Sequence, residues 1–247
     1  MKKNILLRLS FACLLCLAML QVQAQETYGR SDAPLVAGVL DMQIRTSNPD
    51  EMAYVIKQVL VKQYIEDNKL QATDAELAEF LQRKQLLMEN NRIKLDSRRK
   101  EVRQTLAETS LTAPARAQLE KEGDALDEMD KAMRQAESRA GTAESAAAET
   151  LVAQSFIEQW KVNRALYRQY GGRVIFQQGG AEPLDAWQQF LRDAQKAGQF
   201  KILQQEMEPA LWGYYTTDSM HSFYPDGAAS KEQAINTPWW MLDEPAE

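Results

Sequence analysis

Residues able to carry out polar chemistry are scarce in this chain of 247 residues. It has one histidine, His221, and two cysteines, Cys13 and Cys16, which lie in the N-terminal segment. A Cys/His nucleophile, a multi-histidine metal site or a zinc finger needs more thiols or imidazoles than remain once that segment is removed. We therefore expect no enzyme activity, no bound metal and no cofactor, and we favour binding over bond-making.

The remaining candidates for catalysis have simpler interpretations. His221 lies within the stretch Asp218–Ser222, which contains an acid, hydroxyls and an imidazole, but triads are assembled from distant segments and are recognised by geometry. We expect a surface or capping histidine. The acids Asp124, Asp127 and Glu128 lie on a predicted helix that carries charges of both signs, where a solvated face is the usual role.

The N-terminus has the pattern of a cleaved secretory signal. Three basic residues in the first eight precede the apolar run Leu9–Leu20, and Val22-Gln23-Ala24 supplies small residues before a cut. The run is shorter than the roughly 20 apolar residues that cross a bilayer as a helix. We predict a signal peptide at 1–24 and an exported, soluble, periplasmic or secreted protein without a transmembrane segment. The residues before Cys13 and Cys16 fit a lipoprotein signal poorly.

The charge of the chain argues against a nucleic-acid partner. The formal net charge is −6, and loss of the basic N-terminal segment makes it more negative. Such a surface repels phosphates.

The elements that would position a binding site begin with a short strand and a helix. The apolar run Leu35–Leu40 predicts a strand. Asn48-Pro49-Asp50-Glu51 has the composition of a helix start, with a capping side chain, a proline and two acids near the positive end of the helix dipole. The apolar stripe from Met52 to Tyr64 predicts a buried helix face that ends near Asn68-Lys69.

Two long helices are predicted next. Thr73 and Glu76 have the spacing of a capping box, and no glycine or proline interrupts the run from Leu77 to Thr109. Apolar residues recur at sevens in both helices, which is typical of half a coiled-coil seam: Leu81, Met88, Leu95 and Val102, then Leu119, Leu126 and Met133. A turn at Ser110–Ala113 would join them as an antiparallel hairpin over about 73–140. Because each helix offers so few apolar residues, we expect this hairpin to project from a body.

The C-terminal part predicts a smaller α/β element and a tail. Residues 139–149 are either a hinge or alanine-rich helix, and an apolar helix follows from Leu151 to Gly171-Gly172. A strand, a helix and a strand are predicted within 171–203. The tail 204–247 is rich in aromatic residues and is expected to dock on the body. Trp239-Trp240 would be a C-terminal anchor or, alternatively, a membrane or carbohydrate contact.

The predicted fold class is therefore mainly α: a helical body with a long projecting antiparallel helical hairpin and a small strand-helix-strand element near the C-terminus. The expected domains follow from these segments: 1–24 signal peptide, 25–170 helical domain with the hairpin arm, 171–203 small element, and 204–247 docked tail.

The stretch from Leu35 to Leu81 resembles the N-terminal helical domain of the SurA-like periplasmic chaperones, whose fold is related to the chaperone arms of trigger factor. In that family a strand is followed by an apolar helix, a short loop and a Thr/Ser-Asp-x-Glu-Leu cap, here Thr73-Asp74-Ala75-Glu76-Leu77. The resemblance implies a cradle that holds unfolded outer-envelope proteins through apolar walls. The long hairpin departs from the shorter helices of that domain.

The resemblance also implies that an inserted prolyl isomerase domain of the parvulin type is common. Parvulin domains usually place histidines in the opening strand and near the close. The sequence Arg173-Val174-Ile175-Phe176 is faintly similar to that opening but has no histidine, and His221 lies outside a matching motif. We therefore predict no isomerase activity.

The expected function is a periplasmic holdase-type chaperone that binds non-native envelope proteins. Methionine offers a flexible, polarizable apolar surface that can repack around different clients, so Met88, Met129 and Met133 are the candidate client-binding residues. The simpler interpretation is that they pair the two arm helices. The alternative function is an envelope scaffold or adaptor whose hairpin binds one dedicated protein partner or a second copy of the chain.

Overall fold

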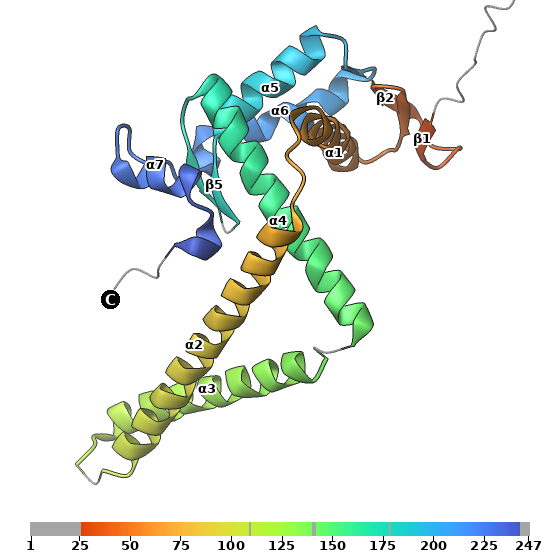
Figure 1. The fold of residues 1–247 in the computed structure, drawn as a ribbon. Helices are drawn as coiled ribbons and strands as arrows, with labels where there is room; N and C mark the ends of the chain where they lie inside the picture. Colours follow the sequence, from red (N-terminus) through yellow and green to blue (C-terminus); the bar gives the residue numbers. More distant parts are fainter. Residues whose placement is uncertain (1–25, 109, 140–141, 178, 243–247) are drawn as a thin grey trace, which may run out of the picture. The chain divides into compact units, whose positions relative to one another are not determined.

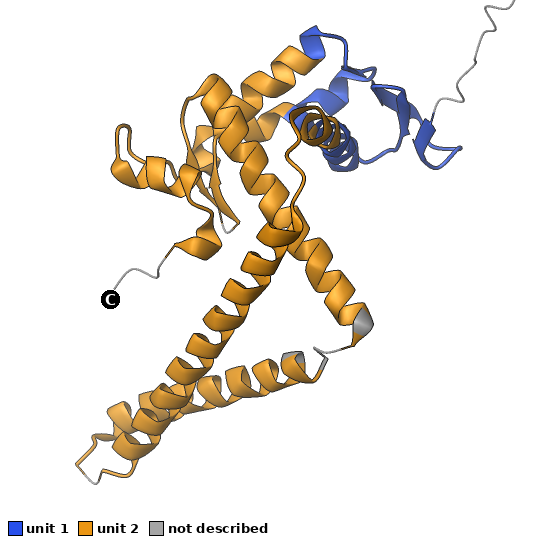
Figure 2. Ribbon diagram, in the orientation of Figure 1, with its two compact units in different colours: residues 1–60, 195–211 blue, residues 61–194, 212–247 orange. Residues whose placement is uncertain are grey.

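A computed structural model describes residues 26–108, 110–139, 142–177 and 179–242 (Figure 1). This part of the chain is mainly helical with two small sheets, which confirms the predicted fold class at that level. It divides into two compact units: unit 1 comprises 1–60 and 195–211, and unit 2 comprises 61–194 and 212–247 (Figure 2). The predicted signal peptide, 1–24, lies outside the described residues.

Unit 1 contains a four-stranded sheet. Its strands are β1 (Glu26–Gly29), β2 (Leu35–Val39), β3 (Met42–Arg45) and β6 (Phe200–Ile202). The strand order is β1-β3-β2-β6, with β1 parallel to β3 and the other neighbours antiparallel. The remaining elements are the first part of α1 (Pro49–Asn68), the last two residues of α5 (Leu184–Lys196), η1 (Gln205–Met207) and the start of α6 (Glu208–Thr216).

Apolar strand residues and a capped helix form unit 1. Val36, Val39 and Ile44 are fully buried, as expected for short strands that cover a helix. The predicted strand at 35–40 and the predicted helix start are both confirmed. The side-chain Oδ1 of Asn48 accepts a hydrogen bond from the backbone N–H of Asp50 at 3.0 Å, which satisfies one of the free donors of α1.

Unit 2 contains the long helices, a two-stranded sheet and the tail. Its elements are the end of α1, α2 (Asp74–Leu106), α3 (Ala113–Arg139), α4 (Ala143–Tyr170), β4 (Ile175–Gln177), β5 (Gly180–Glu182), α5 (Leu184–Lys196, up to Ala194), the end of α6, η2 (Asp218–Met220), α7 (Ala229–Asn236) and η3 (Trp239–Met241).

The junction between α1 and α2 is defined by two capping motifs. Helix α1 ends in a Schellman motif, in which the N–H of Leu70 bonds to the carbonyl of Ile65 at 2.9 Å and Lys69 adopts a φ of 54°. Helix α2 begins with the predicted capping box: the Glu76 N–H donates to the Thr73 hydroxyl, and the Glu76 carboxylate accepts from the Thr73 N–H at 2.8 Å.

The third and fourth helices differ from the sequence-based boundaries by a few residues. Helix α3 begins at Ala113, inside the predicted turn, and α4 begins at Ala143. The choice left open for 139–149 is therefore resolved as helix from Ala143 to Glu149, while 140–141 lie outside the described residues. Helix α4 ends at Gly171, as the sequence predicts, and this glycine has a φ of 67°, which a residue without a Cβ adopts at little cost.

The two strands predicted within 171–203 do not share a sheet. Strand β4 pairs with β5 in a two-stranded antiparallel sheet of unit 2, whereas β6 pairs with β2 in unit 1. Of the turn predicted at Gly179-Gly180, Gly179 lies in a turn, whereas Gly180 is the first residue of β5. A strand of three residues is too short for a sequence pattern to indicate.

The tail contributes buried side chains to unit 2. Trp240 is buried in a cluster with Phe80, Ala153 and Ile157, and Trp239 packs against the same cluster. Ile235 of α7 is buried beside Val174 and Ala181. The indole pair therefore makes the contacts expected of a C-terminal anchor.

None of the helices described here combines the length and the apolar character that crossing a membrane requires.

Candidate functional site

An apolar groove of about 480 Å³ lies where α2, α4 and η3 meet in unit 2. Four elements line it: Phe80, Lys84 and Met88 from α2, Glu137 from α3, Ser145, Ala148, Glu149, Val152 and Phe156 from α4, and Trp239 from η3. We call this set the groove. It is a concave, mostly apolar surface, which is the usual form of a binding site.

Aromatic rings form one wall of the groove. Phe80 and Phe156 stack with their centroids 6.1 Å apart, and Trp239 meets Phe156 edge to face at 5.5 Å. Behind them, Trp240 contacts Phe80 at 4.9 Å and closes the cluster toward the core. These ring pairs fix the wall, because offset and edge-to-face arrangements are the favoured geometries of aromatic contacts.

The open side of the groove exposes flexible and branched apolar side chains. Met88 is 40% exposed and Val152 is 54% exposed, and Leu151, next to Val152, is 67% exposed. Single exposed apolar residues are normal on a protein surface, but here two of them border a concave apolar wall. The groove therefore presents apolar surface that a ligand can cover.

Charged side chains on the groove are paired with one another or with neighbours. Lys84 forms an ion pair with Glu149, which joins α2 to α4 across the groove, and Glu137 pairs with Arg92. The groove thus combines an apolar wall with a rim whose charges are largely compensated.

The seven-residue repeat of α2 is divided between two partners. Leu81 packs against the cluster of Phe80 and Trp240, and Met88 lines the groove. Leu95 and Val102 are buried farther along α2, where a Cβ atom built on Gly123 of α3 would lie 3.6 Å from the Val102 Cγ1. One half of the repeat therefore serves α4 and the tail, and Val102 in the other half serves α3.

The structure places the three predicted client-binding methionines at different sites. Met88 lies on the groove. Met129 and Met133 lie on α3 and do not line it; Met129 is 55% exposed, whereas Met133 is half-buried. The groove thus brings Met88 together with residues that the periodicity of the arm did not indicate, namely Phe156, Val152 and Trp239.

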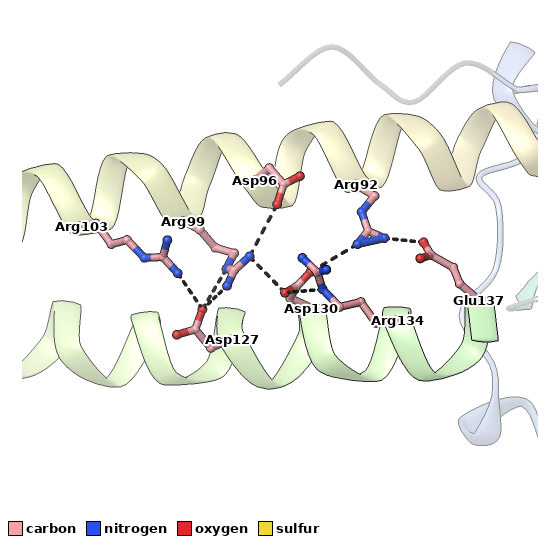
Figure 3. Close-up of polar contacts among 8 residues, drawn as sticks. All are labelled: Arg92, Asp96, Arg99, Arg103, Asp127, Asp130, Arg134 and Glu137. Atoms are coloured by element: carbon pink, nitrogen blue, oxygen red, sulfur yellow. Dashed lines mark hydrogen bonds and ion pairs between the residues drawn. The ribbon is translucent and has the colours of Figure 1, made fainter. Parts of the chain in front are cut away.

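Ion pairs join the stretch of α2 from Arg92 to Arg103 to the stretch of α3 from Glu122 to Glu137, and Figure 3 shows those around Asp127, Asp130 and Glu137. We call the set the charged seam, and its members are Arg92, Arg98, Arg99 and Arg103 of α2 and Glu122, Asp127, Asp130 and Glu137 of α3. The Arg99 Nη2 lies 2.6 Å from the Asp127 Oδ1, and the Arg98 Nε lies 2.7 Å from the Glu122 Oε1.

Asp130 is the centre of the charged seam. Among the described residues of α3, only Asp130 is buried, with 9% of its side chain exposed. Three guanidinium groups contact it: Arg134 at 3.0 Å, Arg99 at 3.1 Å and Arg92 at 3.5 Å. A buried carboxylate needs such pairing, because an isolated charge away from water is strongly unfavourable.

Sequence reasoning missed this role of the acids. A solvated face describes Asp124, Asp127 and Glu128, which are all exposed, but Asp127 also pairs with Arg99 of α2. Asp130, which the sequence analysis did not single out, is buried against Arg99. A signal was present, because Arg92 and Arg99 are seven residues apart and so are Asp130 and Glu137. Complementary charges at the same repeat distance are typical of paired helices.

The arginines hold the pKa values of the seam acids below their ordinary range. A hydrogen bond from Arg99 lowers the pKa of Asp127, one from Arg134 lowers that of Asp130, and one from Arg98 lowers that of Glu122. Each of these carboxylates is therefore ionised at neutral pH.

A further ion pair fixes the start of α2 against α4. Lys161 of α4 donates to the carboxylate of Glu76 and to the carbonyl of Gln71, both at 2.8 Å. Burial alone would raise the pKa of Glu76, but hydrogen bonds from Lys161 and Thr73 outweigh it and lower that pKa. The carboxylate therefore serves the capping box and the helix contact together.

His221 contacts backbone and aromatic groups. Its Nε2 lies 2.7 Å from the carbonyl oxygen of Tyr214, and its ring meets the Tyr214 ring edge to face at 4.8 Å. The carboxylate of Asp218 pairs with Arg173 at 2.7 Å. Within the described residues, no group of three or more His, Cys, Asp or Glu side chains could hold a metal ion.

In comparisons with known proteins, no family model, no curated protein and no solved structure matched the chain.

Proposed function

We propose that this protein is a holdase-type chaperone of the SurA-like class that binds non-native envelope proteins after export, without catalysis. Holding a non-native chain requires accessible apolar surface that adapts to different side chains. The observation that carries the proposal is the groove, where the exposed side chains of Met88 and Val152 border the aromatic wall of Phe80, Phe156 and Trp239.

The arm contributes to the same function in this proposal. Helix α3 lies against α2 through the charged seam, and Met129 is exposed on the surface of α3. In this proposal the two helices act as a projecting hairpin arm. Client segments would be held first in the groove and along the arm, through weak and numerous contacts. Such contacts gain little from hydrogen bonding and must offset the ordering of the client.

A second candidate function is an adaptor for one dedicated partner. Leu86 and Ile93 favour it, because they are exposed, lie seven residues apart on α2 and do not line the groove. A partner helix covers residues at this spacing. The heptad positions Leu95 and Val102 are already buried within the chain, so a partner would use this outer pair instead.

The test is suppression of aggregation, measured by light scattering for two unrelated denatured proteins at near-equimolar amounts of the full-length protein. A Met88→Lys variant places a charge on the groove, and we expect it to lose most of the suppression. The double variant Met129→Lys with Met133→Lys should lose less, because neither residue lines the groove.

The matched control is Ile93→Lys, which adds the same charge to an exposed apolar position of α2 outside the groove. We expect it to suppress aggregation as the wild type does. Equal loss in both variants, or no suppression by the wild type, would contradict the groove as the client site. Suppression of neither protein, with co-purification of a single species that Ile93→Lys abolishes, would establish the adaptor instead.

A further inference from the structure

The contact between α2 and α3 depends on charge more than on apolar packing. The best-buried described side chain of α3 is a carboxylate, and the buried apolar residues that α2 offers along the arm are Leu95 and Val102. A core-facing helix in a stable globular protein usually presents a stripe of three or four apolar residues in every two turns. The charged seam therefore supplies much of what holds the two helices together.

The charged seam is also accessible to salt and protons. Exposure of the seam arginines ranges from well covered at Arg99 to open at Arg103, so water and ions reach most of the pairs. Exposed ion pairs contribute little one by one and are screened by salt, whereas a network with shared partners contributes more. Arg99 alone contacts Asp96, Asp127 and Asp130, which makes the seam a network.

We propose that the charged seam is a reversible latch: acid or high salt releases α3 from α2 and uncovers Leu95 and Val102, while the remainder of unit 2 stays folded. The far end of α2 is held independently of the seam, by burial of Phe80 with Ile157 and Trp240 and by the pair of Glu76 with Lys161. Opening can thus be confined to the arm.

The direction of the pH effect follows from the groups that face one another. From α2, Arg92 and Arg99 face Asp130, Arg99 and Arg103 face Asp127, and Arg98 faces Glu122. The other charged groups near these ion pairs are Arg134 on α3, Asp96 and Glu101 on α2, and Lys84 and Glu149, which lie beside Glu137 on the groove.

The seam acids have lowered pKa values in the folded protein. Their stabilisation is complete above their pKa values in the unfolded chain, about 4, and is lost as the pH falls through the lower folded values. The arginines stay charged in acid and then repel one another around Asp130. Acid therefore removes the attraction and leaves a repulsion, whereas salt removes both.

The test is amide hydrogen exchange of the full-length protein, followed by mass spectrometry and corrected for the intrinsic rate at each pH. At neutral pH we compare about 0.01 M with about 1 M NaCl, between which the Debye length shortens from about 30 to about 3 Å. A second comparison is made near pH 3. We expect exchange in 113–135 to rise by about tenfold in salt or acid, while β2 and α5 stay protected.

Two variants of the charged seam and one control variant separate the latch from a general loss of structure. Arg99→Leu with Asp130→Leu replaces a covered ion pair by apolar side chains, an exchange that is often neutral or stabilising, so the response of 113–135 to salt and acid should fall. Asp130→Asn keeps the shape and removes one charge, and it should open at lower salt than the wild type. Arg30→Leu with Asp32→Leu removes an exposed pair of unit 1 and should leave the response unchanged.

The proposal is overturned if 113–135 and the reference segments lose protection together, if salt and acid leave 113–135 protected, or if the Arg99/Asp130 variant responds as the wild type does. No client is present in this measurement, so its outcome is independent of the chaperone activity proposed above.

Discussion

Val102 of α2 lies against Gly123 of α3, so closely that a Cβ atom built on the glycine would stand 3.6 Å from the Val102 Cγ1. That distance is an ordinary van der Waals contact, so the space between α2 and α3 can hold a methyl group at this position. Gly123→Ala should raise the free energy of unfolding by up to about 1 kcal/mol, because alanine is the better helix former. Denaturation by urea measures the change.

The control for this variant is Gly213→Ala in α6, where no atom lies within 4 Å of the added Cβ. It should gain the same helix propensity without touching α3. A loss of stability confined to Gly123→Ala would mean that α2 and α3 pack more tightly than this geometry allows.

The capping box of α2 should be measurable by itself. Thr73→Ala removes the acceptor for the Glu76 N–H, and we expect a loss of about 1 kcal/mol in the free energy of unfolding. Thr73→Ser keeps the hydroxyl and should retain most of the stability. Equal losses in both variants would show that the methyl group of Thr73, and not its hydrogen bond, is what matters.

Lys69 occupies a position that favours glycine. It follows the end of α1 with a φ of 54°, in a Schellman motif that includes the Leu70–Ile65 hydrogen bond. Lys69→Gly should therefore stabilise the protein by about 1 kcal/mol, since glycine adopts this backbone conformation without steric cost. Lys62→Gly, within the same helix, should destabilise it by a similar amount. Urea denaturation of the pair gives two shifts of opposite sign.

Two adjacent glycines after α4 should differ in their tolerance of a side chain. Gly172 has a φ of +94°, and an added Cβ would lie 2.6 Å from the Cβ of Asp185, so Gly172→Ala should cost about 3 kcal/mol. Gly171 has a φ of +67° and a ψ of −144°, close to a backbone region that is almost restricted to glycine, but no atom lies within 4 Å, so Gly171→Ala should cost about 2 kcal/mol, from backbone strain alone. Equal costs in denaturant would show that Asp185 moves aside.

The phenol of Tyr170 should ionise at a higher pH than an ordinary tyrosine. Burial and a hydrogen bond to Asp193 raise the pKa of its phenol to about 12. A raised pKa favours the neutral form, so the stabilisation is complete below the ordinary value near 10 and is lost as the pH rises toward 12. Ultraviolet titration of the Tyr170→Phe variant should show one fewer phenol that ionises at about pH 12 than titration of the wild type.

Local signals predicted much of the fold. The capped starts of α1 and α2, the strand at Leu35 and the glycine stop after α4 follow from backbone chemistry that one or two residues determine. Partners across the chain did not follow in the same way. The pairing of β6 with β2 brings together residues more than 150 positions apart, and no turn or periodicity encodes it.

In the candidate site, too, local features were predictable from the sequence and long-range partners were not. Periodicity identified Met88 as an apolar position of α2, but it could not show that α4 and the tail supply the opposite wall through Phe156 and Trp239. The charged residues of the arm were visible, yet single charges do not reveal their partners. Only the arrangement of α2 beside α3 distinguishes buried Asp130 from exposed Glu128.

The charged seam also gives α2 and α3 an unusual response to heat. The free energy needed to strip water from ions falls as the temperature rises, whereas the apolar contribution per unit area levels off. Warming therefore weakens the ion-pair network around Asp130 less than it weakens an apolar contact of similar buried area. The contact between α2 and α3 should therefore persist to a higher temperature than their few buried apolar residues would allow.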